Sequence, residues 1–93
     1  MVVGIFTIEL HLPYCRSLKD KRKVIKSLKE KLRGRHNISL AEVDGQDTWQ
    51  RSVLGLAAVA DRRAVLEALY ETISREIESN IPGEITRTET EYL

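Results

Sequence analysis

The chain has a single cysteine, Cys15, so it cannot form an internal disulfide, and this suits the reducing cytoplasm. No apolar run approaches the roughly 20 residues that a membrane-spanning helix needs, so we expect no membrane partner. The opening residues MVVGIFTIEL lack the basic region and small-residue cleavage site of a secretory signal, and we expect them to be folded chain. Asparagine and glutamine are scarce beside the many charged residues, which favours a thermophilic source.

The length and composition of the chain are typical of one soluble domain. The 93 residues are 42% hydrophobic and 31% charged. This length lies near the lower limit for a domain that folds without disulfides or metals. The chain shows no repeat, linker or low-complexity segment, so we expect a single domain over residues 1–93.

The net charge of +1 conceals a strong asymmetry along the chain. Residues 16–35 carry ten Lys or Arg and two acidic residues, which gives this segment a charge of +8. The remaining residues carry five basic and twelve acidic side chains, for a charge of −7. The sequence thus predicts one basic element on an acidic body.

Hydrophobic spacing and capping residues predict four strands and two helices. Ser17 is a suitable N-cap with Asp20 at capping-box spacing, and Gly34 supplies a stop for the first helix. We expect Asp61 to cap the second helix and Val65 to lie on its apolar face. The predicted strands cover residues 2–12, 38–43, 52–60 and 84–93.

This β-α-β-β-α-β order predicts a ferredoxin-like α+β fold, in which two helices cover one face of a four-stranded antiparallel sheet. That fold orders its strands 4-1-3-2, so the first and third strands are central and the other two are edges. The segments predicted for the centre are the most apolar. The last strand carries Arg87, Glu89 and Glu91, as expected of an edge protected against pairing with another chain.

The first predicted helix carries six cations on one stripe beside its apolar face: Lys19, Arg22, Lys23, Lys26, Lys29 and Arg33. Such a stripe can follow nucleic-acid phosphates without reading base sequence. The alternative is a solvated face whose side chains pair with the acidic body. Lys21 lies within the apolar arc, where a lysine extends past the helix end or pairs with an acid, and we expect it to be structural.

The polar segment between the second and third strands holds the only tryptophan, Trp49. Three roles stay open for it: a plug against a sheet edge or helix end, an anchor in an interface between subunits, or a stacking surface for a nucleobase. The interface hypothesis names Asp47, Trp49, Gln50 and Arg51, and its expected assembly is a homodimer.

Residues that could support catalysis or hold a cofactor do not converge. The segment SVLGLAAVA lacks the stacking aromatics of an RNA-recognition motif, and the lone Cys15 excludes the paired-cysteine site of ferredoxin-like metal chaperones. Glu42, Asp44 and Asp47 do not form a metal-binding ladder. Arg16, which precedes a helix, leaves an acylphosphatase-like enzyme as the least favoured reading. We predict no catalytic residue, metal, cofactor or small-molecule substrate.

Three motifs in order resemble the YlxP-like family: SLKDKR, NISLAEVD, and QDTWQR followed by an apolar strand. The resemblance covers nearly the whole chain. It implies a small bacterial protein of uncharacterised function with a ferredoxin-like fold, and no reaction or cofactor comes with it. Genes of this family often lie among genes for transcription termination, translation initiation and ribosome maturation, so the resemblance implies an RNA or ribosomal setting.

Two functions follow as hypotheses. The first is a non-enzymatic module that binds ribosomal or other RNA through the six-cation stripe. The second is a homo-oligomeric interaction protein with the Trp49 segment at its interface.

Overall fold

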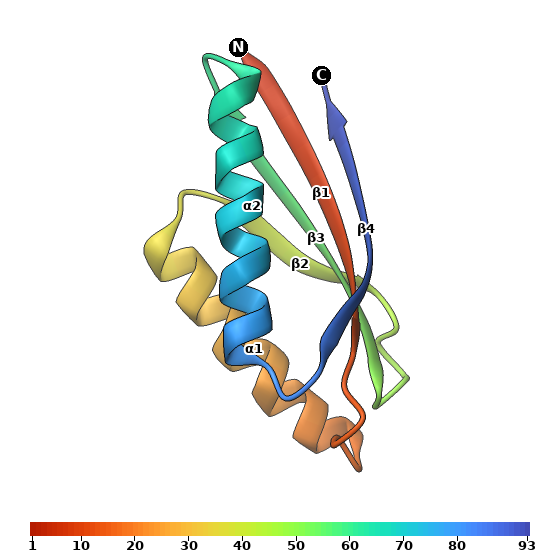
Figure 1. The fold of residues 1–93 in the computed structure, drawn as a ribbon. Helices are drawn as coiled ribbons and strands as arrows, with labels where there is room; N and C mark the ends of the chain where they lie inside the picture. The colour runs from red at the N-terminus through yellow and green to blue at the C-terminus, as the bar shows by residue number, and fades with distance from the viewer.

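Two helices lie across one face of a four-stranded sheet in a computed structural model that describes residues 1–93 (Figure 1). Both termini lie at the same end of the sheet (Figure 1), where the backbones of Val3 and Leu93 exchange two hydrogen bonds of 2.9 and 2.8 Å. The elements follow the predicted order: β1 (Val2–His11), α1 (Leu18–Arg35), β2 (Ser39–Asp44), β3 (Arg51–Ala60), α2 (Arg63–Asn80) and β4 (Glu84–Tyr92).

The strands follow the order β2-β3-β1-β4 along the sheet, which reads 4-1-3-2 from the opposite edge. All three neighbouring pairs are antiparallel. The apolar strands β1 and β3 therefore occupy the centre, where both of their edges are hydrogen-bonded. The charged strand β4 lies at one edge, and its exposed acidic and basic side chains oppose pairing with another chain.

The hydrophobic core fills the space between the helices and the sheet as a single cluster of 17 buried residues. Along β1, every second side chain points into this core, because successive side chains of a strand face opposite ways. The buried members are Phe6, Ile8 and Leu10. The other face of the sheet has no helix over it, and we call it the open face (Figure 1).

A close contact between α2 and β1 shows how tightly this core is packed. The ring of Tyr70 stacks on Phe6 with the centroids 4.7 Å apart, and its hydroxyl donates a hydrogen bond to the Gly4 carbonyl. A Cβ atom at Gly4 would lie 3.0 Å from the side chains of Leu66 and Tyr70. The lack of a side chain at Gly4 thus allows α2 to approach the central strand.

The helix ends confirm one capping prediction and correct two others. The Ser17 hydroxyl accepts from the Asp20 N–H at 3.1 Å, as predicted, while the Asp20 carboxylate accepts from the N–H of Arg16. Helix α1 continues through Gly34 and ends at His36 in extended backbone, which requires no left-handed glycine. Asp61 does not cap α2, because the N-cap is Arg62 and no side chain bonds there.

The prediction that Val65 belongs to the apolar face of α2 is also wrong. Val65 is 44% exposed. The residues that α2 buries are Leu66, Tyr70, Ile73 and Ile77, which recur at intervals of three or four positions. Val65 precedes the first of them by one residue, and a step of about 100° turns its side chain away from the sheet.

Candidate functional site

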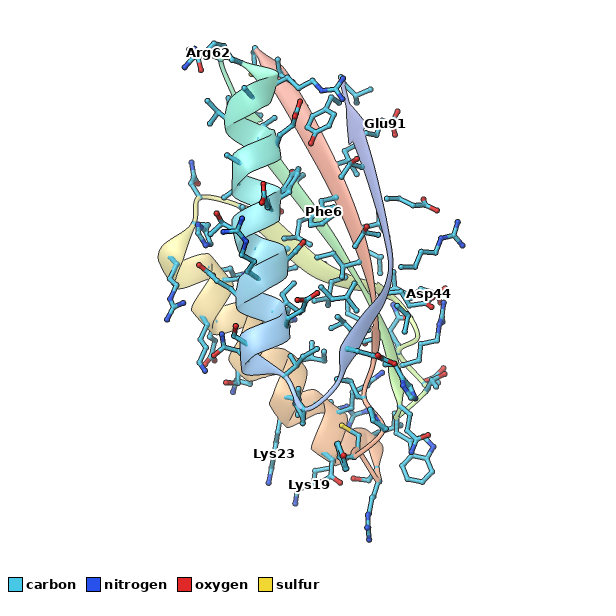
Figure 2. The ribbon with its side chains drawn as sticks, viewed as in Figure 1. Phe6, Lys19, Lys23, Asp44, Arg62 and Glu91 are labelled. Carbon is cyan, nitrogen blue, oxygen red and sulfur yellow. The ribbon has the colours of Figure 1, made fainter.

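The six cations predicted as a stripe all lie on the surface of α1. Five are exposed and Lys29 is half-buried. Lys19 and Lys23 extend from the N-terminal half of the helix away from the sheet (Figure 2). We call the set Lys19, Arg22, Lys23, Lys26, Lys29 and Arg33 the α1 stripe.

Five of these six cations have no partner within the chain. Lys19, Arg22, Lys23, Lys26 and Lys29 take part in none of the ion pairs of the structure. Arg33 differs, because its guanidinium donates to the carbonyl of Leu40 on β2. The stripe therefore stays largely unneutralised by the acidic body.

Lys21 is buried inside the molecule and fastens the β2–β3 loop (residues 45–50) to α1. It is 1% exposed, and its ammonium lies 3.2 Å from Glu42 Oε2, so the prediction that it pairs with an acid is confirmed. The same ammonium donates to the carbonyls of Gly45, Gln46 and Arg51 at 2.5, 3.2 and 3.3 Å. A buried charge is tolerated because all of these acceptors surround it.

Glu42 is held on both sides. Its carboxylate accepts a hydrogen bond of 2.5 Å from the buried hydroxyl of Ser52 in addition to the contact with Lys21. The negative charge of Glu42 is thus compensated inside the protein. It is unavailable to neutralise the α1 stripe.

The backbone of the β2–β3 loop is shaped by Gly45, whose φ is +76°. A Cβ there would lie 3.0 Å from the Arg51 carbonyl, so this left-handed position favours glycine sterically as well as conformationally. The Asp44 carboxylate accepts from the Gly45 N–H at 2.8 Å, and the Thr48 N–H bonds to the Gly45 carbonyl at 3.1 Å. These bonds close a tight turn within the loop.

A recess of about 440 Å³ lies between α1 and this loop. Three cations of the α1 stripe, Arg22, Lys26 and Lys29, form its helix side, and Gln46 and Asp47 form its loop side. Lys21 and Glu42 also line it but neutralise each other. Three unpaired cations therefore face one unpaired carboxylate, that of Asp47, and the recess is electropositive.

A second loop, residues 12–17, is tied to the β2–β3 loop at the same end of the molecule. The Leu12 N–H donates to the Gln50 carbonyl at 2.9 Å. The Gln50 amide donates to the carbonyls of Pro13 and Cys15 at 3.3 and 3.4 Å. The two loops carry Tyr14, which is 77% exposed, and Trp49, which is 45% exposed. Trp49 is therefore no buried plug within this chain.

The four residues named for an interface have different surroundings, and their role in an interface stays a prediction. Asp47 lines the recess, Trp49 is exposed, and Gln50 joins the two loops. Arg51 lies on the open face, where it donates to Glu9 at 2.8 Å and lies 3.7 Å from Asp44. The Arg51 guanidinium, with help from the Thr86 hydroxyl, holds the pKa of Glu9 below its usual value.

The chemistry-bearing side chains do not assemble into a reactive centre. Cys15 is buried, and this burial raises the pKa of its thiol, which keeps it in the less reactive neutral form. His36 is bonded to Glu76 at 3.1 Å. No group of three or more His, Cys, Asp or Glu side chains is placed to hold a metal ion. Neither helix has the length and apolarity to cross a membrane.

The sequence indicated the stripe and the loop but not three residues that lie beside them. Gln46 and Glu42 line the recess, and Tyr14 stands beside the loop contact, yet none of the three was assigned to a binding surface. The available signal was Lys21, since a lysine inside an apolar arc requires nearby acceptors. For Tyr14, the only signal in the sequence was its position as an aromatic residue in a loop before a basic helix.

Residues 3–90 match the family described as "Protein of unknown function (DUF503)". The chain belongs to this family. It is 36% identical over 90 residues to the "Uncharacterized protein YlxP" of Bacillus subtilis (strain 168), and the alignment covers 95% of this chain and 98% of that protein. The resemblance to YlxP-like proteins that the three sequence motifs indicated is confirmed.

Among solved structures, a protein titled "Structural Genomics, protein YJCS" aligns over 96% of this chain and 96% of its own, with a TM-score of 0.57. The two sequences are 10% identical, so the similarity concerns the fold alone. A de novo designed protein with a ferredoxin fold, LFR1 1, covers 100% of this chain and 83% of its own length, with 11% identity and a TM-score of 0.47.

Proposed function

We propose that this DUF503 family member is a non-enzymatic RNA-binding module that holds RNA phosphates along the α1 stripe. The supporting observation is that five stripe cations have no partner within the chain, and that three of these five converge on one recess. Clustered unpaired Lys and Arg side chains raise the local potential and bind phosphates with release of counterions.

The pairing of the remaining charges supports this proposal. On α2, Arg63 pairs with Glu67 at 2.9 Å, and Arg75 pairs with Glu71. On β4, Arg87 pairs with Glu89. The acidic body thus satisfies several of its own carboxylates, and an external polyanion is the natural partner of the stripe.

A pair of charge-reversal variants tests the proposal. Lys23→Glu/Lys26→Glu places two carboxylates on the stripe, and the matched control Arg62→Glu/Arg75→Glu makes the same charge change around α2. Affinity for a ribosomal RNA fragment would be measured by fluorescence anisotropy between about 50 and 200 mM salt, where phosphate binding changes steeply. We expect the stripe variant to lose about tenfold or more in affinity, with a shallower salt dependence.

The control variant should bind nearly as well as the wild type. Equal losses in the two variants would assign the effect to net charge and not to the stripe. Absence of binding by the wild type at low salt would refute the proposal.

A second candidate function, self-association, is favoured by a strip of apolar residues on the open face, beside the charged residues Glu9 and Arg51. Strand β3 is nearly continuous in apolar residues, a pattern typical of strands covered on both faces, yet helices cover one face only. Val43, Val59 and Leu93 are 55%, 58% and 65% exposed. A second copy would offer the same face, and a twofold axis would set the two apolar strips against each other.

Sedimentation would test self-association with the matched pair Val59→Glu and Val65→Glu. Both valines are exposed, but Val65 lies on α2, away from the sheet. We expect a wild-type dimer that only Val59→Glu disrupts. A monomeric wild type at high protein concentration would remove this candidate, and Trp49→Ala would show whether the β2–β3 loop takes part.

A further inference from the structure

The geometry points to single-stranded RNA as the preferred ligand of this surface, with unpaired bases stacked on Tyr14 and Trp49 and phosphates held by the N-terminal half of the α1 stripe. This inference rests on the proposed function, because it names the class of RNA that the stripe would bind. It adds a pair of base-binding aromatic residues to a phosphate-binding helix.

The first observation is how the five aromatic side chains are used. Phe6 and Tyr70 stack on each other in the core, and Tyr92 lies under the Arg63 guanidinium at 4.5 Å from the ring centroid. Only Tyr14 and Trp49 remain exposed, at 77% and 45%. Both lie in the two loops that Gln50 joins, and exposed aromatic side chains are common in binding sites.

The second observation is that these two loops are fastened together. The Gln50 side chain, next to Trp49, donates to the carbonyls of Pro13 and Cys15, the two neighbours of Tyr14. Lys21 holds the same β2–β3 loop to the beginning of α1 through the carbonyls of Gly45 and Gln46, and it also bonds to the carbonyl of Arg51 at the start of β3. Such bonds fix the two aromatic residues relative to the helix before any ligand arrives, which lowers the entropic cost of binding.

The third observation is the charge around this end of the molecule. Arg16, Lys19, Arg22 and Lys23 occupy the start of α1 and the residue before its N-cap, and all four are exposed and belong to no ion pair. At a rise of 1.5 Å per residue, the N-terminal half of the stripe, from Lys19 to Lys26, is about 10 Å long and begins beside the two loops.

Stacking on aromatic side chains allows a protein to bind single strands in preference to duplexes. Every unpaired base offers a free aromatic face, whereas the bases of a duplex are already stacked on one another. The open sheet face offers no such platform, because its central residues Val3, Ile5 and Ala57 are aliphatic. Selectivity for single strands would therefore come from the two loops, and a surface without them would bind both forms by charge alone.

Trp49 is the only tryptophan, so intrinsic fluorescence reports on this site directly. The wild type would be titrated at low salt with a single-stranded oligoadenylate, an RNA duplex of equal length, and inorganic polyphosphate as a polyanion without bases. We expect the single strand to quench Trp49 and to bind about fivefold or more tightly than the duplex, since stacking contributes that much or more per base. Polyphosphate should bind without quenching.

Tyr14→Ala and Trp49→Leu should each weaken binding of the single strand about fivefold or more and leave binding of the duplex unchanged. Tyr92→Leu, which removes an aromatic ring outside the two loops, is the matched control and should change neither. Thermal denaturation of each variant would establish that it is folded before binding is measured.

Equal affinity for single strand and duplex without quenching of Trp49 would overturn this inference and leave the proposed function standing. Failure of all three polyanions to bind would overturn both. A Trp49 signal that depends on protein concentration alone, together with a dimer in sedimentation, would assign Trp49 to a subunit interface and also overturn the inference.

Discussion

The two helices of this protein have the same structural task and different surfaces. Both are 18 residues long, lie across the same face of the sheet and bury four residues each. Yet α1 carries nine basic and two acidic residues, whereas α2 carries two basic and four acidic residues. Because α2 covers the same sheet without a net positive charge, packing on the sheet does not explain the positive charge of α1.

The pairing of those charges differs as much as their number. The two arginines of α2 pair with glutamates four residues away, as is usual on a solvated helix. The α1 stripe has five cations without such partners. The arginines of α2 are thus neutralised within the helix, while five cations of the α1 stripe remain free for the proposed RNA ligand.

The buried faces differ too, because each helix buries one polar group of a different kind. Lys21 on α1 binds loop carbonyls and Glu42, and Tyr70 on α2 binds the carbonyl of Gly4. Lys21 positions the β2–β3 loop, and Tyr70 fixes α2 on β1. Variants at these positions separate the two roles.

The largest effect is expected from Lys21→Met. It would leave Glu42 and three carbonyl groups without their shared donor, and breaking a buried ion pair on one side costs about 3–5 kcal/mol. The free energy of unfolding, measured in urea, should fall by about 3 kcal/mol. Lys23→Met on the exposed side is the control and should change it by less than about 0.5 kcal/mol. If Lys21→Met lowers the free energy of unfolding by less than about 1 kcal/mol, the bonds of Lys21 with Glu42 and the carbonyl groups are not needed for stability.

Tyr70→Phe should have an intermediate effect. It removes the hydroxyl that bonds to the Gly4 carbonyl but keeps the ring stacked on Phe6. An unsatisfied buried acceptor costs about 1–3 kcal/mol, so we expect a loss of about 2 kcal/mol in urea denaturation. RNA binding should be unchanged, because α2 lies outside the proposed interface. A parallel loss of RNA affinity would contradict the division of roles between the helices.

Changes at the two helix N-caps should have smaller effects on the free energy of unfolding. We expect a loss for the change in α1 and a gain for the change in α2. Ser17→Ala removes the side-chain cap of α1 and should cost about 1 kcal/mol. Helix α2 has no side-chain cap at Arg62, so Arg62→Ser should stabilise the protein by about 0.5–1 kcal/mol. Thermal melts of both variants would measure this difference. If Arg62→Ser is neutral, the Arg62 backbone does not admit a capping bond.

The smallest effect concerns pH. Burial raises the pKa of Tyr70 above its usual value, so the folded chain holds the phenol proton more tightly than the unfolded chain. The neutral phenol of Tyr70 contributes fully to stability below about pH 10, which is its pKa in the unfolded chain. This contribution is lost as the pH rises through the pKa of Tyr70 in the folded chain. The stability difference between wild type and Tyr70→Phe should therefore narrow above about pH 10. A constant difference would mean that the pKa of Tyr70 is the same in both states.

The sequence allowed the helices, strands and sheet positions to be predicted because these depend on local periodicity. Alternation along residues 2–12 and helical spacing after Ser17 are properties of neighbouring residues. Two errors lie at Gly34 and Asp61, where the chain could leave or enter a helix in several ways, and a third concerns Val65, which is exposed beside the buried face of α2. Tertiary packing chose an extended exit at His36 and an uncapped start at Arg62.

The candidate site was predictable in parts but not as a whole. The stripe follows from a turn of about 100° per residue, and Trp49 stands out by composition. The contacts that join them link residues far apart in the chain, such as Lys21 with Gly45, 24 positions apart, and Gln50 with Pro13, 37 positions apart. No local pattern specifies which carbonyl groups a buried lysine will meet.

The basic helix, the acidic α+β domain around it and the tryptophan in a polar loop could all be read from the amino-acid sequence. Tertiary packing leaves five stripe cations without partners and holds the β2–β3 loop against α1. Charge and hydrophobic periodicity depend on single residues and their neighbours in the chain, whereas the distance between two side chains depends on how separate segments pack. The β2–β3 loop with Trp49 is part of a candidate binding surface because Lys21 bonds it to α1 and Gln50 bonds it to the loop of residues 12–17.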